Sequence, residues 1–594
     1  MPSTKMFPKK LLRCFILSAI MINIMLSYIS PILGDEQGII LDKGWVMKTG
    51  DNPEWSKPDF DDGDWPPVRV DLPWEETGHP NYDGYAWYRL KFEVPESWKP
   101  RDVHGFISLS LGAIDDVDVT YVNGEQIGST GAMPPDYHTA YYTPRFYRIP
   151  TRIVKWSEEN VLAIRVYDGQ GDGGLYQGPV SLRLPSFADL MDITFQVDSN
   201  GIYFYPDPLP VGINLHNYSQ IDLDLNLVLT LANDRVDTVR TFEAREDSMF
   251  IRSKSKIAVT ETFSPPRPGF YRVICTINDS LIQSMVFGYS PEIIETPLTR
   301  EADFNEFWNQ RKQDLAVIAP DYKMMKSEQS NAELDVYLVE MMSYGKVNIR
   351  GWYSVPKKPG PHAAILSVPG YTSTMWPNLQ RTNVATFALN PRGHGNSKDD
   401  IDPRGEEYMF IGFDPQHPEN YIYAGAFMDC LRAVDFLTSR PEIDAERIGI
   451  EGESQGGGLS FATAALDNRI VFCAPDIPWL CDWVGYLETE YWGWENYPKL
   501  FEKHPDLTFT GVNRFLSYFD TMNMAEWITC PVLMSVGLQD KVCPPRTSFA
   551  TYNNVTAEKE YRVYPYAGHS TGRQHSEVKN KWMAKILGVE ETGL

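Results

Sequence analysis

Residues 447–458 run Arg-Ile-Gly-Ile-Glu-Gly-Glu-Ser-Gln-Gly-Gly-Gly. The apolar start of this stretch, Ile448–Glu451, predicts a buried β-strand, and the small residues after it predict a sharp turn into a helix at Leu459–Leu466. Glycines two positions before and after Ser454 suit such a turn, because larger side chains there would clash. A Gly-x-Ser-x-Gly string also arises by chance in a chain of 594 residues. The strand before it and the helix after it are what indicate a nucleophile elbow, with the Ser454 hydroxyl at the start of a helix.

The region around this elbow, residues 293–594, alternates helical patterns with short buried apolar runs. An amphipathic helix is expected at Phe304–Leu315. Buried strands are expected at Ala363–Val368, Ala385–Leu389, Ile448–Glu451 and Val532–Val536. Because strands and helices alternate over the whole region, we predict an α/β-hydrolase domain with a doubly wound, mostly parallel sheet.

A serine hydroxyl is a poor nucleophile at neutral pH, so Ser454 requires a base, and that base requires an acid to orient it. In α/β-hydrolases the chain order is serine, acid, histidine. Downstream of Ser454 lie His504, His569 and His575. His569 follows the strand-like Glu560–Val563, where the last loop of the sheet would carry the base, whereas His504 falls in a helical insertion and His575 in the final helix. We therefore predict His569 as the base.

Two aspartates compete for the role of the acid. Asp540 follows the apolar strand Pro531–Gly537 and so lies at the carboxyl end of a strand, where ligands meet an open α/β sheet. Asp476 follows the strand Ile470–Ala474 in the same way. The segment between Asp540 and His569 is long enough for one helix and one strand, which favours Asp540.

Acyl transfer through Ser454 would also develop an oxyanion, which backbone N–H groups must stabilise. One donor should be the N–H of Gln455, the residue after the nucleophile. The other should come from the loop after the strand Ala363–Val368, where Pro369 has no N–H to donate. We predict Tyr371 as this second donor.

Residues 36–292 carry a different pattern, in which short alternating runs are punctuated by Gly, Pro and Asp. Such runs predict antiparallel β-sandwiches. In residues 36–190 they occur at Tyr88–Val94, Gly105–Leu111, Val117–Val122 and Val161–Tyr167. Residues 191–292 contain Leu223–Ala232 and Tyr271–Ile277, and an immunoglobulin-like sandwich is the simplest interpretation. Neither region contains internal repeats, which argues against a β-propeller.

The first of these regions resembles the galactose-binding-like jelly roll found at the front of many glycoside hydrolases. The resemblance rests on Trp87-Tyr88-Arg89, on Ile114–Asp118 leading to Val122-Asn123-Gly124, and on Asn160–Tyr167. It leaves open whether this domain binds sugar or a structural calcium, or serves only as a scaffold. Five tryptophans could either stack on sugar rings or form the core of the sandwich: Trp45, Trp55, Trp65, Trp74 and Trp87.

The N-terminus has the pattern of a signal peptide. Four basic residues precede the apolar run Cys14–Leu33, and cleavage is expected near Gly34. We therefore predict residues 1–34 as a signal peptide and the protein as secreted or periplasmic, with an uncleaved membrane anchor as the alternative. The formal charge of −25 at pH 7 argues against nucleic acid and anionic membranes as partners.

Six cysteines lie beyond the predicted cleavage site, in apolar segments and without tight spacing: Cys275, Cys430, Cys473, Cys481, Cys530 and Cys543. This distribution predicts small core residues. Export would permit a disulfide, but the sequence names no pair. No cluster of cysteine and histidine has the spacing of a zinc site.

Residues 297–594 resemble the acetyl xylan esterase and cephalosporin C deacetylase family, the seventh carbohydrate esterase family. The matching motifs are Phe304 with Phe307-Trp308, Pro391-Arg392-Gly393, Tyr421 and Tyr423 before Asp429 and Arg432, Gly452–Gly457, Asp476–Asp482 and Gly537–Pro545. The resemblance implies Ser454, Asp540 and His569 as the triad and Tyr371 and Gln455 as the oxyanion donors, in agreement with the choice made from the residues themselves. The acyl-transfer chemistry that it implies requires no metal or organic cofactor.

Three positions depart from the family pattern. The family usually has Arg-Gly-Gln where this chain has Arg392-Gly393-His394, and His-Glu where this chain has His569-Ser570. An arginine that commonly follows the tyrosine motif is Ala424 here. The triad is unaffected, so these departures bear on the substrate. His394 is a candidate for a substrate contact, but a structural turn histidine is the favoured interpretation.

We therefore expect a secreted serine esterase that removes O-acetyl groups from polysaccharides or oligosaccharides through an acetyl-enzyme intermediate. Its partner would be an acetylated carbohydrate, and the family's tendency to oligomerise leaves a homo-oligomer open. One alternative is a serine peptidase of the prolyl oligopeptidase type, which shares the elbow and the triad order but usually has a propeller in front. The other is a carbohydrate-binding protein with an inactive esterase domain, which the intact triad residues argue against.

Overall fold

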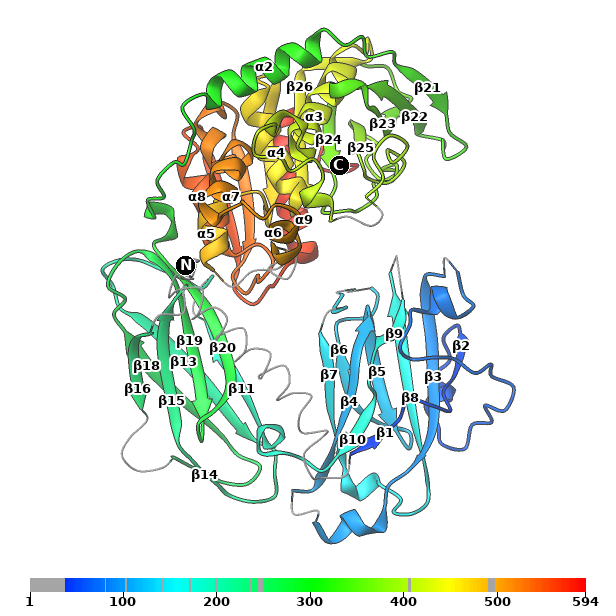
Figure 1. The fold of residues 1–594 in the computed structure, drawn as a ribbon. Coiled ribbons are helices and arrows are strands. Elements are labelled where there is room, and N and C mark those ends of the chain that lie inside the picture. The colour runs from blue at the N-terminus through cyan, green and yellow to red at the C-terminus, as the bar shows by residue number, and fades with distance from the viewer. Residues whose placement is uncertain are drawn as a thin grey trace, which may run out of the picture. The chain divides into compact units, whose positions relative to one another are not determined.

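A computed structural model gives the fold of the chain (Figure 1). It describes residues 38–594 except 81, 102–103, 136, 138, 142, 170–172, 198–199, 235–237, 244–248, 404–406 and 490–496. The predicted signal peptide lies outside the described residues. The chain divides into two compact units, and the unit that carries the elbow consists of Phe195–Ile213, Asn226–Asp247 and Thr260–Leu594.

A nine-stranded sheet forms the centre of the α/β region, in the order β21-β22-β23-β25-β24-β26-β27-β28-β29. Its strands are β21 (Lys323–Lys326), β22 (Leu334–Met342), β23 (Asn348–Pro356), β24 (His362–Val368), β25 (Ala385–Asn390), β26 (Ile443–Glu453), β27 (Ile470–Asp476), β28 (Val532–Gly537) and β29 (Lys559–Tyr564). The pairs from β21 to β25 along this order are antiparallel, and every later pair is parallel. The mostly parallel sheet and the four predicted strands are thus confirmed.

Helices cover both faces of this sheet (Figure 1). The α-helices described are α2 (Phe304–Ala316), α3 (Ile422–Thr438), α4 (Gln455–Leu466), α5 (Trp483–Glu488), α6 (Tyr497–Lys503), α7 (Phe509–Leu516), α8 (Pro545–Asn554) and α9 (Gly572–Leu587). Side chains of β24 alternate between the two faces: Ala363 and Ile365 pack with Met583 and Leu587 of α9, whereas Leu366 belongs to the cluster that contains α3 and α4. Because both faces are covered, the strand is mostly apolar, with His362 and Ser367 as its polar residues.

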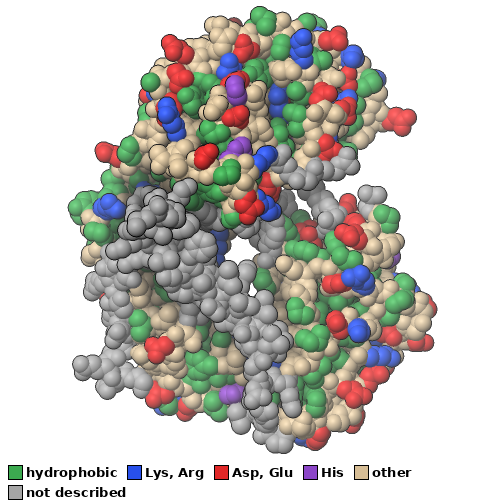
Figure 2. Space-filling model, in the orientation of Figure 1, with side chains coloured by type: hydrophobic (Ala, Val, Ile, Leu, Met, Phe, Trp, Pro, Cys, Tyr) green, Lys and Arg blue, Asp and Glu red, His purple; other side chains and the backbone are tan. Residues whose placement is uncertain are grey.

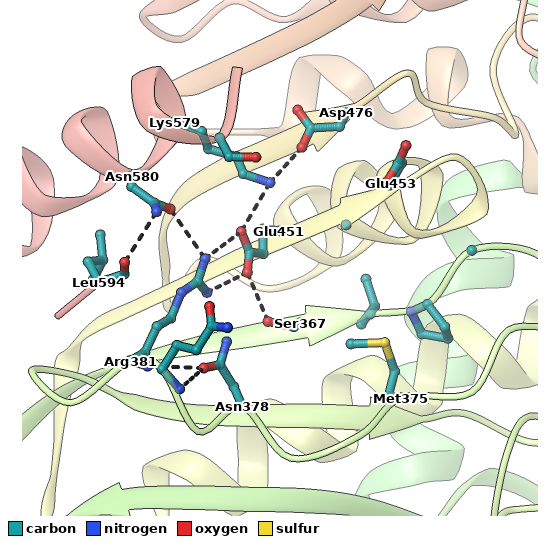
Figure 3. Close-up of a pocket in the computed structure, with 16 residues that line it drawn as sticks. Ser367, Met375, Asn378, Arg381, Glu451, Glu453, Asp476, Lys579, Asn580 and Leu594 are labelled. Atoms are coloured by element: carbon teal, nitrogen blue, oxygen red, sulfur yellow. Dashed lines mark hydrogen bonds and ion pairs between the residues drawn. The ribbon is translucent and has the colours of Figure 1, made fainter. Parts of the chain in front are cut away.

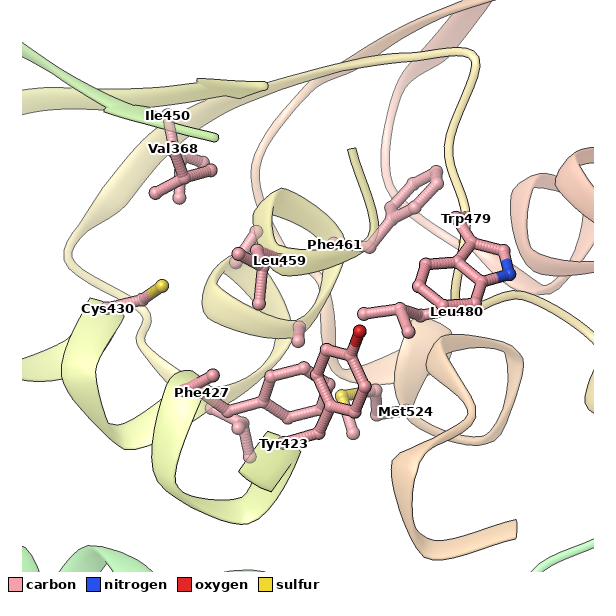
Figure 4. Close-up of a cluster of buried hydrophobic side chains, with 14 of the residues drawn as sticks. Val368, Tyr423, Phe427, Cys430, Ile450, Leu459, Phe461, Trp479, Leu480 and Met524 are labelled. Atoms are coloured by element: carbon pink, nitrogen blue, oxygen red, sulfur yellow. The ribbon is translucent and has the colours of Figure 1, made fainter. Parts of the chain in front are cut away.

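The core beneath the elbow joins α3, α4 and the sheet. Figure 4 shows Leu459 of α4 with Phe427 and Cys430 of α3, in the same buried cluster as Val368 and Ile450 of β24 and β26. Each of these side chains is at most 3% exposed. Close packing therefore supports the start of α4, which follows the serine.

The other unit contains two five-stranded sheets built from the strands between Ile39 and Arg183. One has the order β1-β10-β4-β7, with β9 also pairing β4, and the other has the order β2-β3-β8-β5-β6. The strands are β1 (Ile39–Ile40), β2 (Val46–Thr49), β3 (Gly84–Glu93), β4 (Phe106–Asp115), β5 (Val117–Val122), β6 (Glu125–Thr130), β7 (Pro144–Pro150), β8 (Glu159–Asp168), β9 (Gly174–Gln177) and β10 (Ser181–Arg183). One apolar cluster contains both Leu109 of β4 and Ile164 of β8, so the two sheets face one another across a shared core.

The tryptophans of this unit are mostly buried, Trp45 and Trp74 in that shared core and Trp65 and Trp87 in a second cluster. Trp45, Trp65, Trp74 and Trp87 are each at most 4% exposed. Trp55 is partly exposed, and its ring lies edge-on to Trp65 and Trp87, with centroids 5.0 and 6.3 Å apart. The core interpretation therefore applies to the four buried tryptophans, because their ring faces are not available to a sugar.

The strands between Met191 and Tyr289 form three sheets, ordered β11-β13-β18, β14-β17 and β12-β20-β19-β15-β16. They are β11 (Met191–Gln196), β12 (Ile202–Tyr203), β13 (Leu209–Asn217), β14 (Leu223–Leu225), β15 (Leu227–Asn233), β16 (Thr238–Glu243), β17 (Met249–Ile251), β18 (Lys256–Phe263), β19 (Gly269–Ile277) and β20 (Ser280–Tyr289). The single run expected at Leu223–Ala232 is divided at Asn226, because β14 pairs with β17 and β15 with β16 and β19. The five-stranded sheet belongs to the same compact unit as the α/β region.

All six cysteines that follow the predicted signal peptide are buried and free of disulfides. Burial raises the pKa of Cys275, Cys430 and Cys530 to about 12. These thiols therefore stay protonated and behave as small apolar side chains. The prediction of small core residues is confirmed.

Acidic and basic side chains are interspersed on the face of the molecule shown in Figure 2, rather than segregated into blocks of one sign. Among the described helices, none is both long enough and apolar enough to span a lipid bilayer.

Candidate active site

The steric reason for the two glycines of the elbow lies in two close backbone approaches. A Cβ added at Gly452 would lie 2.5 Å from backbone atoms of Gly456, and one added at Gly456 would lie 2.4 Å from the carbonyl oxygen of Val368. Both distances are shorter than real Cβ contacts. Glycine at both positions therefore lets α4 begin directly against the end of β24.

Ser454 occupies the turn between β26 and α4, with φ 58° and ψ −119°. This is a costly conformation for a residue with a side chain, typically by about 1–3 kcal/mol. Two hydrogen bonds hold it: the Ser454 N–H donates to the Asp476 carbonyl, and the Trp479 N–H donates to the Ser454 carbonyl, both at 2.9 Å. The strained turn thus directs the Ser454 side chain away from the strand and the helix that flank it.

The structure brings the three predicted triad side chains into one hydrogen-bonded line. His569 Nε2 lies 3.0 Å from Ser454 Oγ, and His569 Nδ1 lies 2.8 Å from Asp540 Oδ2. The other carboxylate oxygen of Asp540 accepts from the backbone N–H groups of Val542 and Cys543, both at 2.8 Å. Asp540 can therefore hold the imidazole with Nδ1 protonated and Nε2 free to accept the serine proton.

The surroundings of His569 set its pKa above the ordinary value. Burial opposes the charged imidazolium, but the hydrogen bond from His569 to Asp540 and the charge of that carboxylate outweigh it, and Glu453 adds to the effect. The side chain of Asp540 is fully buried, whereas that of His569 is 22% exposed. A raised pKa makes His569 a stronger base in its neutral form, which suits proton transfer from a hydroxyl.

The two predicted oxyanion donors belong to segments that are in contact. Tyr371 follows β24, and the added Cβ at Gly456 would also lie 3.1 Å from the carbonyl oxygen of Pro369 at the start of this loop. The Tyr371 hydroxyl accepts a hydrogen bond from the Met409 N–H at 3.1 Å, which ties the loop to a second segment. The loop that carries Tyr371 and the elbow that carries Gln455 thus lie against one another.

His394 lies behind the elbow rather than in a substrate pocket. It is fully buried, and its Nε2 lies 2.9 Å from Nε2 of Gln455, whose Oε1 accepts from the Tyr423 hydroxyl at 2.7 Å. Since the Gln455 amide nitrogen can only donate, His394 Nε2 must accept and Nδ1 carries the proton. His394 is therefore not placed to contact a substrate directly. It supports the side chain of Gln455 instead.

Asp476, the rival for the acid, belongs to an ion network with Lys579, Glu451 and Arg381 (Figure 3). Its oxygens lie 2.6 Å from Nε2 of His575 and 2.6 Å from Nζ of Lys579, and Lys579 also reaches Glu451 at 3.2 Å. Arg381 pairs with the same glutamate. The network lines a cavity of about 430 Å³ that reaches Gly452 and Glu453. These contacts occupy Asp476, so Asp540 is the aspartate in contact with His569.

Cys543, predicted as a small core residue, lies beside the nucleophile in the structure. Its Sγ lies 3.9 Å from Ser454 Oγ, and its N–H is one of the two that donate to Asp540. Burial holds the pKa of this thiol well above its ordinary range, so it is an uncharged neighbour. Its position three residues after Asp540 is the signal in the sequence that could have indicated this.

Two groups of side chains in the described residues are close enough to hold a metal ion. One is Asp540 with Cys543 and His569, which the triad geometry already accounts for. The other is Asp115, Asp116 and Asp168 in the first unit. There Asp116 accepts hydrogen bonds from the hydroxyls of Tyr137 and Thr139 and from the Gly169 N–H. Donors from the protein thus already occupy the oxygens of this carboxylate.

Comparison with known proteins places this geometry in a family. Residues 295–586 match the acetyl xylan esterase family. The solved acetyl xylan esterase from Paenibacillus sp. R4 is 33% identical to this chain, and the match covers 98% of that esterase and 50% of this chain, with a TM-score of 0.47. The chain belongs to the acetyl xylan esterase family. The resemblance inferred from the motifs is thus confirmed.

Two further acetyl esterases are also similar to this chain. The acetyl xylan esterase 1 of Thermoanaerobacterium sp. JW/SL YS485 is 28% identical, with 99% of that chain and 49% of this one covered and a TM-score of 0.46. The acetyl esterase Axe7A of Xylanibacter ruminicola is 28% identical over 365 residues, which cover 82% of that protein and 58% of this chain. As a member of the acetyl xylan esterase family, this protein is an acetylesterase, a carboxylic-ester hydrolase.

Proposed function

We propose that this esterase removes O-acetyl groups from polysaccharides or oligosaccharides with Ser454 as its nucleophile. The observation that carries the proposal is the hydrogen-bonded line from Asp540 through His569 to Ser454 at a nucleophile elbow, at 2.8 and 3.0 Å. The family match and the curated acetyl esterase relative support acetylated carbohydrate as the substrate class.

In the first half of the reaction, His569 Nε2 takes the proton of Ser454 Oγ as this oxygen attacks the acetyl carbonyl carbon. The carbonyl oxygen becomes an oxyanion, which the N–H groups of Gln455 and Tyr371 would stabilise; one such donor is typically worth about 2.7–4 kcal/mol. Asp540 stabilises the imidazolium that forms. His569 then gives the proton to the sugar oxygen, the sugar leaves with its hydroxyl restored, and the acetyl group remains on Ser454.

In the second half, water replaces the sugar. His569 takes a proton from the water as its oxygen attacks the acetyl-enzyme, and the same two N–H groups receive the second oxyanion. Collapse of this intermediate returns the proton to Ser454 Oγ and releases acetate. Every proton transfer uses one atom, Nε2 of His569, which is why the Asp540 contact to Nδ1 matters in both halves.

The front of the chain is assigned as part of the same proposal. Residues 36–190 form a galactose-binding-like domain and residues 191–292 an immunoglobulin-like domain, and cleavage of residues 1–34 delivers the enzyme to the outside of the cytoplasm. Support comes from the two facing sheets of the first unit and from the N-terminal sequence pattern. N-terminal sequencing of the exported protein would test the cleavage, since a mature chain that begins at Met1 contradicts it.

Acetate release decides the proposed function. Purified protein should release acetate from acetylated xylan and hydrolyse p-nitrophenyl acetate, and Ser454→Ala should abolish both. A proline-containing peptide amide tests the peptidase alternative, because cleavage of the peptide without acetate release would contradict the esterase. Full activity of Ser454→Ala would contradict the assignment of the nucleophile.

A further inference from the structure

We propose that Gln539 is a positioning residue that ties the loops of the catalytic acid and base to strand β20. The inference rests on the proposed roles of Asp540 and His569. Gln539 directly precedes Asp540, and its side chain is directed at a strand 253 residues earlier in the chain.

Every polar atom of the Gln539 side-chain amide is used. Oε1 accepts from the Val286 N–H at 3.0 Å, and Nε2 donates to the Val286 carbonyl at 3.1 Å. Nε2 also donates to the carbonyl of Pro565 at 2.7 Å, and the Gln539 backbone N–H donates to the carbonyl of Ala567 at 2.9 Å. Pro565 and Ala567 lie in the loop that leads to His569, so one residue connects strand β20, the acid loop and the base loop.

The contact completes an open strand edge. Val286 pairs with Arg272 of β19 on one side. On its other side, within the described residues, β12 pairs with β20 at Gly288 and Tyr289. The carboxamide of Gln539 has the donor and the acceptor of a peptide group, so it satisfies the N–H and C=O of Val286 where β12 does not reach.

Side-chain packing beside this contact is incomplete, so the hydrogen bonds of Gln539 hold the acid loop to the sheet at this point. A cavity of about 190 Å³ lies between the sheet and the acid loop, lined by Tyr271 and Ser284 on one side and by Asp540 and Lys541 on the other. Side chains therefore do not fill the space between the loop and the sheet there, and the amide spans it at one point.

Contacts further from the triad hold the same sheet against the hydrolase. Arg546 of α8 pairs with Asp234 at 2.6 Å, and the Phe270 and Phe549 rings lie 5.6 Å apart. Asn553 of α8 donates to the carbonyls of Pro291 and Ile294, both at 2.9 Å. Because several contacts hold the sheet, removing one of them should leave it in place, which offers a control that touches neither catalytic loop.

The test compares Gln539→Met with Asn553→Ala in the full chain. Methionine keeps the length of the side chain but cannot make the amide hydrogen bonds. The readout is phosphorylation of Ser454 by diethyl p-nitrophenyl phosphate between pH 5 and 9, measured as release of p-nitrophenolate. His569 takes the proton of Ser454 Oγ, this oxygen bonds to phosphorus, and the aryloxide leaves, so no acetylated sugar is needed. We expect Gln539→Met to slow this step by about tenfold or more, since small misplacements of reacting groups are costly. Its acidic limb should move to lower pH, because a loosened contact between Asp540 and His569 no longer raises the pKa of the imidazole.

Asn553→Ala should keep the rate and the acidic limb of the unsubstituted protein, even if its melting temperature falls. A Gln539→Met variant with unchanged rate and pH profile overturns the proposal, as does an Asn553→Ala variant with the same losses. If Gln539→Met does not fold, Gln539→Asn, whose amide is too short to reach β20, takes its place with the same expectations. Failure of the unsubstituted enzyme to release acetate would instead contradict the proposed function, since phosphorylation does not depend on the substrate.

Discussion

The side-chain amide of Gln455 lies 2.9 Å from Nε2 of His394, and both residues are fully buried. Gln455 is held at its other end by the Tyr423 hydroxyl. Because the backbone N–H of Gln455 is a predicted oxyanion donor, the imidazole supports the oxyanion hole through the side chain of the donor residue. The family usually has glutamine at position 394, and its amide oxygen could accept the same hydrogen bond.

This relationship predicts different outcomes for two substitutions of His394. His394→Gln keeps an acceptor for the Gln455 amide, so kcat for p-nitrophenyl acetate should stay within about threefold of the unsubstituted enzyme. His394→Leu leaves the buried amide nitrogen of Gln455 without an acceptor, which costs about 1–3 kcal/mol of folding stability. It also loosens the residue that carries the oxyanion donor. Steady-state kinetics and urea unfolding check both. Equal kinetics for the two variants would mean that the hydrogen bond has no part in catalysis.

His394 also predicts a dependence of stability on pH. Burial lowers its pKa to about 4 in the folded protein, below the ordinary value of about 6.5. Between these values the unfolded chain binds more protons than the folded chain, so the free energy of unfolding falls as the pH is lowered from 6.5 towards 4, by about 3 kcal/mol for this group. His394→Gln cannot titrate, so its loss of stability over this window should be smaller. Urea unfolding at several pH values would show parallel curves if the prediction is wrong.

The sequence was sufficient for the central strands and the order of the triad, because these depend on local patterns. Ala363–Val368 and Val532–Val536 are apolar except for one serine each, as is typical of parallel strands covered on both faces. Asp540 and His569 could be chosen because each follows a predicted strand, and ligands meet an open sheet at its carboxyl edge.

The supports of the site could not be predicted, because they depend on contacts between distant parts of the chain. Gln539 meets Val286 across 253 residues, and Lys579 meets Asp476 across 103. No local sequence pattern marks Gln539 or Lys579 as buried and paired. The role of His394 needed the position of Gln455, which only the folded elbow provides. Sequence patterns thus indicate the reacting groups, whereas the residues that orient them emerge from tertiary packing.

Glu453 should influence the pH profile, because its charge is among those that raise the pKa of His569, after the opposing effect of burial and the larger effect of Asp540. The enzyme needs neutral His569, so activity should fall as the pH drops through a value above the ordinary histidine pKa. Glu453→Gln removes one charge that favours the imidazolium. The acidic limb of kcat/KM should then move to lower pH while the kcat on the plateau changes little. An unmoved limb would contradict an electrostatic role for Glu453.

Asp540 and Asp476 form a matched pair for the last prediction, because both are buried carboxylates in contact with a histidine but only one of these histidines meets Ser454. Asp540→Asn should lower kcat by about 10⁴-fold, since an amide cannot hold the imidazole in the reactive tautomer. Asp476→Asn should instead act on stability. It leaves Lys579 with one carboxylate partner, Glu451, in a buried network, where removing one member of an ion pair costs about 3–5 kcal/mol. Its kcat should stay within about threefold of the unsubstituted enzyme under conditions where it remains folded. Kinetics and melting temperature of the two variants check this, and a large loss of kcat in Asp476→Asn with an active Asp540→Asn would reverse the assignment of the acid.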